Sequence, residues 1–265
     1  MEKQKKIGIT LSGGGVRGAA HAAVLAVLED NGIEPDMISG SSAGAMAGAL
    51  YAAGYKPTEI LDFFDENSNI FRWRNFSRYK PGILDAEKYA EIFEPWLNGH
   101  TFESLHKELH ICVTDVLNAR MRFFSSGELV LPVLASAALP GVFSPVEIGE
   151  DWYIDGGVMN NFPTEPLLGR CSFLIGSFVS PKKRVEKEEL NSTIKLLNRA
   201  SGLTFLSSSM YKFGQCDFLF MPQELSNYGT FDSKKIREIY EVGYEYASKR
   251  VPELLLIMEK RRQEA

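Results

Sequence analysis

The chain has 265 residues, of which 45% are hydrophobic and 24% charged, so its composition excludes a disordered or fibrous protein. A net charge of -5 argues against nucleic acid as a partner, because binding phosphates requires a positive surface. We expect one domain over residues 1–265, with a core over about residues 7–222 and a C-terminal helix over about residues 233–262.

Residues 7–53 alternate between strand and helix patterns. A strand at 7–11 leads through a glycine loop into a helix at 19–31, and a strand at 37–39 leads into a helix at 43–53. This β-α-β-α order predicts an α/β fold with a mainly parallel central sheet and helices on both faces. Ligand chemistry in such sheets lies at the carboxyl ends of the strands, where both glycine motifs fall.

The loop after the first strand reads Ser12-Gly13-Gly14-Gly15-Val16-Arg17-Gly18. Consecutive glycines let backbone N-H groups point outward at the positive end of a helix, which makes an anion site. In acyl transfer such a site is an oxyanion hole, whose donors each stabilise the attacked carbonyl oxygen by about 3 kcal/mol. Arg17 is a candidate for adding positive charge or holding a substrate phosphate.

The same loop also satisfies the G-x-G-x-x-G pattern of dinucleotide-binding proteins. That interpretation requires an acidic residue at the end of the second strand, whereas Asp36 precedes this strand and a serine motif occupies its end. A P-loop is excluded more firmly, because no Lys-Ser or Lys-Thr pair follows the glycines.

The second strand runs into Gly40-Ser41-Ser42-Ala43-Gly44, a G-x-S-x-G motif between a short strand and a helix. A sharp turn at this point strains the backbone and pushes the Ser42 side chain into a cleft. The small residues Gly40 and Gly44 permit the close approach that such a turn needs. Ser42 is therefore the candidate nucleophile, although so short a pattern also arises by accident in glycine-rich loops.

Two uncharged stretches, residues 37–55 and 129–146, approach the length of a membrane-spanning helix. The second contains three prolines, and the first consists mostly of small residues rather than leucine or isoleucine. We interpret such runs in this composition as buried, closely packed segments of a folded protein.

Residues 60–97 mix aromatic with charged side chains and are expected to form helices and loops. Two interpretations stay open, a cap with a wall that faces lipid, or ordinary packing of helices on the sheet. The aromatic side chains in question are Phe63, Phe64, Phe71, Trp73, Phe76, Tyr79, Tyr89, Phe93 and Trp96.

The second half of the chain continues the alternation. Further strands are expected at 109–114, 120–125, 152–154, 173–179 and 218–221, and helices at 132–139, 194–213 and from 234 onward. The charged residues 182–189 are interpreted as a surface connection. The apolar residues 254–258 of the last helix favour packing on the domain over contact with a membrane.

A serine nucleophile needs a base, and histidine is the usual one. All four histidines, His21, His100, His106 and His110, precede the Asp155 motif. An α/β-hydrolase places its histidine after the acidic residue, so this order disfavours that fold. His21 follows the glycine loop by about one helical turn and is expected to buttress it.

The remaining candidate base is Asp155, which an apolar strand places directly before Gly156 and Gly157. An aspartate is a weak base, so it must act through a short direct contact in a partly dehydrated site. The sequence therefore favours a Ser-Asp dyad, although an Asp-Gly pair taken alone is more often a turn.

The three cysteines, Cys112, Cys171 and Cys216, are odd in number and far apart in the sequence. This spacing predicts neither a disulfide framework nor a zinc site, and we expect reduced thiols. The amino terminus passes from charged residues directly into a strand pattern, without the apolar segment of a signal peptide. We therefore expect a cytoplasmic protein.

Together these motifs resemble the patatin-like phospholipase family, whose pattern is a G-G-G-x-R-G segment, then G-x-S-x-G, then D-G-G or D-G-A. All three motifs occur here in that order, and three ordered motifs are far more specific than one. The resemblance spans about residues 7–222. It extends to residues 136–145, to Thr114-Asp115 and to Asn160-Asn161-Phe162-Pro163.

The resemblance implies a three-layer α/β/α fold and hydrolysis of a fatty acyl ester or phospholipid through an acyl-Ser42 intermediate, with Asp155 as base. It also implies that amides of Gly13, Gly14 and Gly15 form the oxyanion hole, and that no metal, cofactor or histidine takes part. We expect the protein in the cytoplasm, and peripheral contact with a membrane stays open.

Three alternatives remain open. A thioesterase or transacylase would use the same dyad and differ only in its leaving group or acceptor. A lipid-binding regulatory domain would keep the fold with a dormant site, and Ser42 would then fail to react with an acylating probe. A nucleotide-binding oxidoreductase is the most distant alternative, and tight binding of a dinucleotide would raise the melting temperature.

Overall fold

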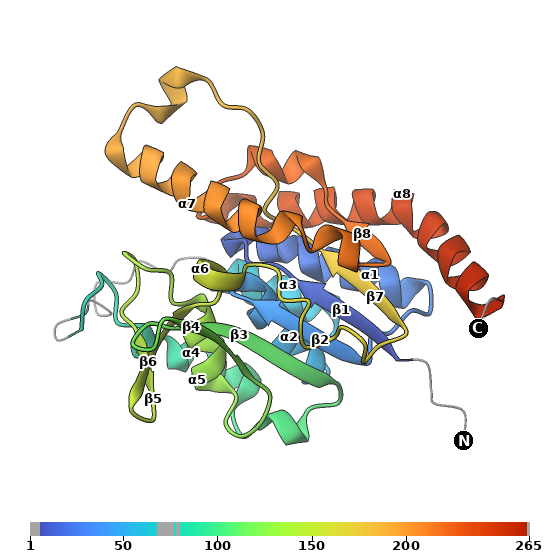
Figure 1. Ribbon diagram of the computed structural model, residues 1–265, viewed down its shortest axis with the longest axis horizontal. Helices are drawn as coiled ribbons and strands as arrows, with labels where there is room; N and C mark the ends of the chain where they lie inside the picture. The colour runs from blue at the N-terminus through green and yellow to red at the C-terminus, as the bar shows by residue number, and fades with distance from the viewer. Residues whose placement is uncertain (1–5, 68–76, 78–79, 264–265) are drawn as a thin grey trace.

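The computed structural model describes residues 6–67, 77 and 80–263, which fold around one mixed sheet (Figure 1). Eight strands of this part of the chain pair in the order β5-β6-β3-β2-β1-β7-β8, with β4 joined to β3. The strands are β1 (Ile7–Leu11), β2 (Met37–Ser41), β3 (Glu108–Asp115), β4 (Arg120–Phe124), β5 (Val146–Ile148), β6 (Asp151–Asp155), β7 (Phe173–Ser177) and β8 (Phe218–Phe220).

The strands β3, β2, β1, β7 and β8 are parallel to one another, whereas β4, β5 and β6 pair antiparallel. The parallel core confirms the predicted α/β class with a mainly parallel sheet. This parallel arrangement arises because a helix follows each short apolar strand at the start of the chain. The helix carries the chain back, so that the next strand begins at the same end of the sheet.

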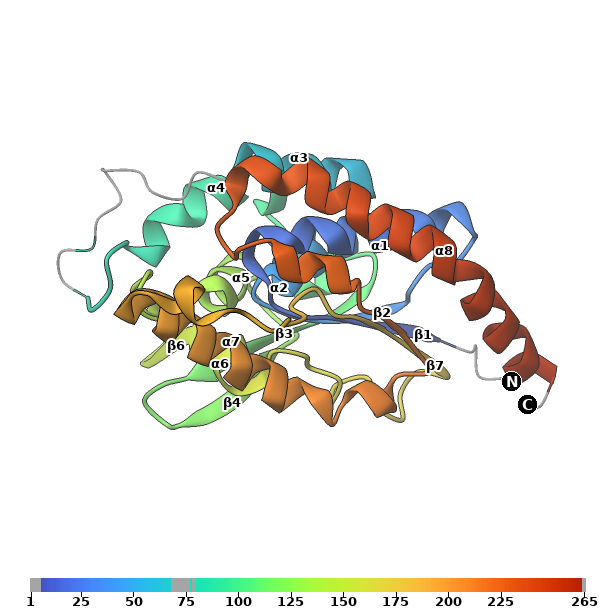
Figure 2. The same ribbon diagram turned by 90° about the horizontal axis from the view of Figure 1, so that it is seen from above.

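Helices cover both faces of the sheet, which gives the expected three layers (Figure 2). One face carries α1 (Ala19–Asp30), α2 (Ala43–Ala52), α3 (Pro57–Glu66) and α8 (Ile236–Gln263), and the other carries α6 (Gly157–Asn160) and α7 (Thr193–Met210). The remaining α-helices are α4 (Ala90–Leu97) and α5 (Val130–Ala137), and α5 packs against α2, α4, β3 and β6.

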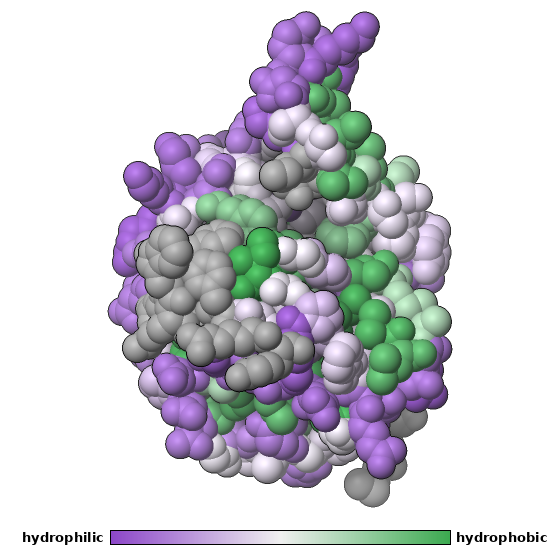
Figure 3. Space-filling model, turned by 90° about the vertical axis from the view of Figure 1, so that its left-hand side faces the viewer, coloured by the Kyte–Doolittle hydropathy of each residue, from purple (hydrophilic) through white to green (hydrophobic). Residues whose placement is uncertain are grey.

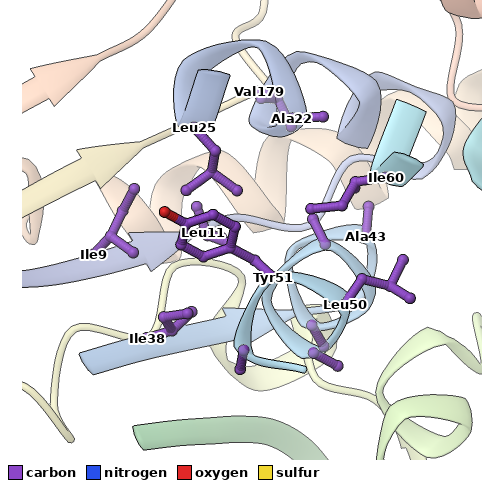
Figure 4. Packing of buried hydrophobic residues seen from close by; sticks show 14 of the residues in the cluster. Ile9, Leu11, Ala22, Leu25, Ile38, Ala43, Leu50, Tyr51, Ile60 and Val179 are labelled. Carbon is purple, nitrogen blue, oxygen red and sulfur yellow. The ribbon is translucent and has the colours of Figure 1, made fainter. Parts of the chain in front are cut away.

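The core lies between β1, β2 and the helices that follow them (Figure 4). Ile9, Leu11 and Ile38 from the sheet pack with Leu25 and Leu50 from α1 and α2, and all five side chains are buried. Burial of side chains of this size stabilises the fold by about 1.5–3 kcal/mol each. The uncharged stretch 37–55 is thus buried as a strand and a helix. No helix of the described residues has both the length and the apolar character needed to cross a bilayer.

In the aromatic region over residues 60–97, the described side chains pack on the core, as the second of the two interpretations expects. Phe63, Tyr89 and Phe93 are buried in the main core, and the Phe63 ring contacts those of Phe93 and Trp96. Phe64 of the same region is also buried. Phe71, Trp73, Phe76 and Tyr79 lie outside the described residues.

The long helix α8 packs along α1, so close that a Cβ atom on Gly243 would lie 2.9 Å from the Ala20 Cβ. Leu254 and Met258 are buried near its end. The apolar residues 254–258 therefore pack on the protein with these two side chains, while Leu255 and Leu256 remain exposed.

The turn from β2 into α2 depends on glycines that face neighbouring backbone. A Cβ atom on Gly44 would lie 2.2 Å from the Leu11 carbonyl oxygen, and one on Gly40 would lie 2.4 Å from the Gly44 carbonyl oxygen. Since backbone cannot move aside as a flexible side chain can, these two positions keep β1, β2 and α2 at their observed separation.

We expect Gly44→Ala to lower the free energy of unfolding by about 2–4 kcal/mol, because the clash with β1 outweighs the gain of about 1 kcal/mol in helix propensity. Gly214→Ala is the matched control, since a Cβ atom there meets nothing within 4 Å. Urea unfolding of both variants checks the prediction, and equal stability of the two would contradict it.

Candidate active site

Ser42 lies on the turn between β2 and α2 in a strained conformation, with φ of 52° and ψ of -121°. Positive φ is costly for a residue with a Cβ atom and persists only where the surroundings impose it. Its amide donates to Ser136 Oγ at 2.9 Å, and Ser136 Oγ donates to the Cys112 carbonyl at 2.6 Å. The turn is therefore held from α5 and β3 as well as by its own glycines.

Strand β3 brings the two candidate catalytic residues together. Its residues 111–112 pair with β2 on one edge and β4 on the other, and its residues 113–115 pair with β4 and β6. Since β4 occupies one edge throughout, β2 and β6 must share the other. On that edge Cys112 pairs with Ser41, and Val113 pairs with Asp155. The two strands run toward each other and place Ser42 beside Asp155.

Ser42 Oγ donates a hydrogen bond to Asp155 Oδ2 at 2.7 Å. The other carboxylate oxygen, Oδ1, accepts from the Gly157 amide at 2.7 Å. The Asp155 backbone is held as well, since its amide donates to the Ala138 carbonyl and its carbonyl accepts from Thr114 Oγ1. The carboxylate thus has a fixed orientation, with one oxygen committed to the backbone and the other facing the serine.

Burial raises the pKa of Asp155 to about 6, although the hydrogen bonds from Ser42 and Gly157 act in the opposite direction. The residue is only 3% exposed, and no cation contacts its carboxylate among the described residues. A carboxylate with a raised pKa is a better proton acceptor than an ordinary aspartate, and this one is still ionised at neutral pH.

The glycine loop lies against Ser42, because a Cβ atom on Gly13 would be 3.1 Å from the Ser42 Cβ. The Gly13 amide donates to the Asn161 carbonyl at 3.1 Å. By contrast, the amides of Gly14 and Gly15 donate to no acceptor in the described part of the chain. Gly15 has a φ of +60°, which glycine adopts without strain. Among the three glycines expected to form the oxyanion hole, the amide of Gly13 is therefore already paired, and those of Gly14 and Gly15 are free to donate.

Arg17 braces this loop from inside. Its Nε donates to the Gly14 carbonyl at 3.1 Å, and its Nη2 donates to Ser180 Oγ at 3.1 Å. Ser180 Oγ in turn donates to the Gly13 carbonyl at 2.7 Å. The side chain is 4% exposed, and burial lowers its pKa to about 10. Arg17 thus holds the loop, and its contact with a substrate phosphate stays a prediction.

His21 has the buttressing position that the sequence suggests. It is fully buried, its Nε2 lies 2.8 Å from the Ser12 carbonyl oxygen and its Nδ1 lies 2.8 Å from Ser177 Oγ. Burial lowers the pKa of His21 to about 4, so the ring is neutral, with Nε2 donating and Nδ1 accepting. It links the glycine loop to β7 and makes neither of its hydrogen bonds to Ser42 or Asp155.

Asn161 is a part of the site to which the sequence assigns no role of its own. Its carbonyl occupies the Gly13 amide, and its Oδ1 would lie within 2.9 Å of a Cβ atom on Gly157. Only the family-like Asn160-Asn161-Phe162-Pro163 segment could have indicated it. Within the described residues, no group of three His, Cys, Asp or Glu side chains is placed to hold a metal ion.

Comparison with known proteins identifies relatives of the whole arrangement. Residues 9–168 match the family described as "Patatin-like phospholipase". An uncharacterized NTE family protein of Mycobacterium tuberculosis is 31% identical over 206 residues, which cover 73% of this chain and 55% of the relative. Lysophospholipase NTE1 of Coccidioides immitis is 27% identical over 272 residues, which cover 91% of this chain and 17% of the relative.

The chain therefore spans about half the length of the mycobacterial relative and under a fifth of the fungal one. Among solved structures, VipD from Legionella pneumophila resembles it with a TM-score of 0.52 at 14% identity, over 93% of this chain and 66% of VipD. At this identity the likeness concerns the fold.

We expect Asp155→Asn to stabilise the protein above pH 7. The wild-type carboxyl has a pKa of about 6 in the folded state and about 4 when unfolded, so its contribution to stability is complete below pH 4 and is lost as pH rises through 6. The amide removes this loss, on the order of 2 kcal/mol at pH 8 and nothing at pH 4. Urea unfolding at both pH values measures it, and an equal change at both would contradict it.

Proposed function

Because this chain belongs to the patatin-like phospholipase family, we propose that it is a serine-dependent lipid acyl hydrolase in which Ser42 is the nucleophile and Asp155 the base. The observation that carries the proposal is the 2.7 Å hydrogen bond from Ser42 Oγ to a buried Asp155 carboxylate with a raised pKa. Nucleophile and base in direct contact are the arrangement that covalent catalysis requires.

In the first half of the reaction, Ser42 Oγ attacks the carbonyl carbon of the acyl ester and its proton passes to Asp155 Oδ2. The free amides of Gly14 and Gly15 receive the negative oxygen of the tetrahedral intermediate, and each such donor contributes about 3 kcal/mol to its stabilisation. The intermediate collapses when Asp155 returns the proton to the leaving alcohol. Ser42 is then left as an acyl ester.

In the second half, Asp155 takes a proton from a water molecule that attacks the acyl-Ser42 carbonyl. The same two amides stabilise the second intermediate, and the fatty acid leaves as Ser42 recovers its proton. Asp155 can serve as both base and acid because a pKa of about 6 lies close to the working pH, whereas an ordinary aspartate would accept the proton poorly.

The family and its relatives support the substrate class that we propose. Lysophospholipase NTE1 of Coccidioides immitis aligns over 91% of this chain, which favours the fatty acyl ester of a phospholipid or lysophospholipid as substrate. Lysophospholipids, diacyl phospholipids and acyl thioesters, assayed in parallel, separate a lipase from a thioesterase with the same dyad.

We expect a fluorophosphonate to label the wild-type chain at Ser42 and to leave Ser42→Ala unlabelled. Hydrolysis of p-nitrophenyl esters should fall by at least about 10³-fold in Ser42→Ala and Asp155→Asn, because each variant removes one member of a pair that acts as a unit. Ser248→Ala, at an exposed serine on α8, is the matched control and should label and turn over normally. Undiminished labelling of Ser42→Ala would refute the assignment.

The pH dependence of kcat/KM reports the base of the free enzyme. Since burial raises the pKa of Asp155 to about 6, we expect kcat/KM for a soluble ester to rise tenfold per pH unit below 6 and to level off above it. An acid limb near pH 4 would show that the ionising group is an ordinary carboxyl, which would count against Asp155. Recovery of activity at pH 8 after incubation at each pH excludes acid inactivation.

A further inference from the structure

The helix α7 carries a stripe of apolar side chains that face solvent. Leu196, Leu203 and Met210 follow one another at intervals of seven residues, which places them along one stripe of a helix. They are 55%, 45% and 59% exposed. Gly202 and Ser209, each about 100° around the helix from the stripe residue that follows it, are buried. A surface helix normally shows the reverse pattern, so this apolar stripe needs an explanation.

Other exposed apolar side chains lie on α6, which packs against this helix, and on the β3–β4 region that contacts α6. Helix α6 begins two residues after Asp155, packs against α7 and exposes Met159. The turn after β3 exposes Leu117, and Met121 on β4 receives a hydrogen bond from Asn160 of α6. Figure 3 views the molecule from this end and shows several hydrophobic areas among the hydrophilic ones.

The charge of this region differs from that of the rest of the protein. The chain has a net charge of -5, yet residues 191–216 contain Lys195, Arg199 and Lys212 and no acidic residue. The Lys212 ammonium is paired with Glu165, whereas Lys195 and Arg199 make no ion pair with any described residue. An exposed apolar stripe with flanking cations is the pattern of helices that lie on anionic lipid surfaces.

Lys182 adds an ammonium group on the inner side of α7. Its Nζ lies 2.9 Å from the position of a Cβ atom on Gly202 and makes no hydrogen bond or ion pair with the residues that the structure describes. Burial and the nearby charges of Arg17 and Arg199 lower the pKa of Lys182 to about 8. Lys182 thus has no acidic partner among the described residues. Its ammonium group is available to pair with the phosphate of an anionic lipid.

We propose that the α7 face, defined as Leu196, Leu203 and Met210 of α7 with Met159 of α6, docks on the surface of an anionic phospholipid bilayer. Docking there would place the bilayer beside α6, which begins two residues after Asp155 and packs against α7. The inference deepens the proposed function, since it names the surface on which that site would meet its acyl ester.

The test is flotation of the full chain carrying Ser42→Ala, which prevents consumption of the lipid, with vesicles. Vesicles of mixed phosphatidylcholine and phosphatidylglycerol should carry the protein, and vesicles of phosphatidylcholine alone or high salt should weaken binding, because the cations contribute to attachment. Leu196→Glu with Leu203→Glu should weaken binding to the mixed vesicles by about tenfold or more.

Leu255→Glu with Leu256→Glu is the matched control, because it adds the same charges at exposed leucines of α8. This pair should float as the parent does. Leu196→Glu alone, a single change at a residue of the α7 face that is 55% exposed, should weaken binding in the same direction with less risk to folding. Equal binding of the α7 pair and the parent, equal loss in the control pair, or no flotation of the parent would each overturn the proposal.

Two further readouts separate this proposal from its alternatives. The wild-type chain is also assayed on a soluble short-chain ester. Cleavage of the ester without flotation refutes the docking proposal alone. Flotation without cleavage refutes the hydrolase proposal alone. Light scattering without lipid tests self-association. A dimer that the α7 pair converts to monomer would show that the α7 face binds a second copy, which would overturn the lipid proposal.

Discussion

The site depends on one constraint, the sharing of a single edge of β3 by two strands that run toward each other. β2 arrives in parallel and ends at Ser41 opposite Cys112, and β6 arrives antiparallel and ends at Asp155 opposite Val113. Neighbouring residues of one strand thus fix both halves of the Ser42–Asp155 pair. The hydrogen bond of 2.7 Å between them rests on this backbone pairing, with support from the Ser136 and Thr114 hydroxyl groups, which suits the proposed dyad without a third member.

The same arrangement has an energetic cost. Asp155 ends a buried strand and is only 3% exposed, so its charge is poorly solvated and its pKa is raised. Ser42 holds a positive φ that favours glycine, and Ser136 and the glycines around it maintain that conformation. Strain and desolvation are both stored at the proposed dyad and are offset by the packed core around β1, β2, α1 and α2, as is common where stability and reactivity conflict.

Much of this is predictable from local sequence. The alternation before Ala53 predicts the parallel core, and the glycine motifs predict where Ser42 and the loop lie, because turn chemistry depends on a few adjacent residues. The strand β5 was missed, since three residues show no periodicity. The occupation of the Gly13 amide by Asn161 and the bracing role of Arg17 were missed as well, because such pairings join residues far apart in the chain.

The central claim is that Ser42 carries the acyl group. Rapid quenching of the reaction with a p-nitrophenyl ester, followed by digestion and mass spectrometry of the peptides, tests it most directly. The account predicts an acyl adduct on the peptide containing Ser42 that forms and decays at the rate of turnover in the wild-type chain. An adduct on another residue, or turnover with no adduct under conditions that trap serine esters, would contradict it.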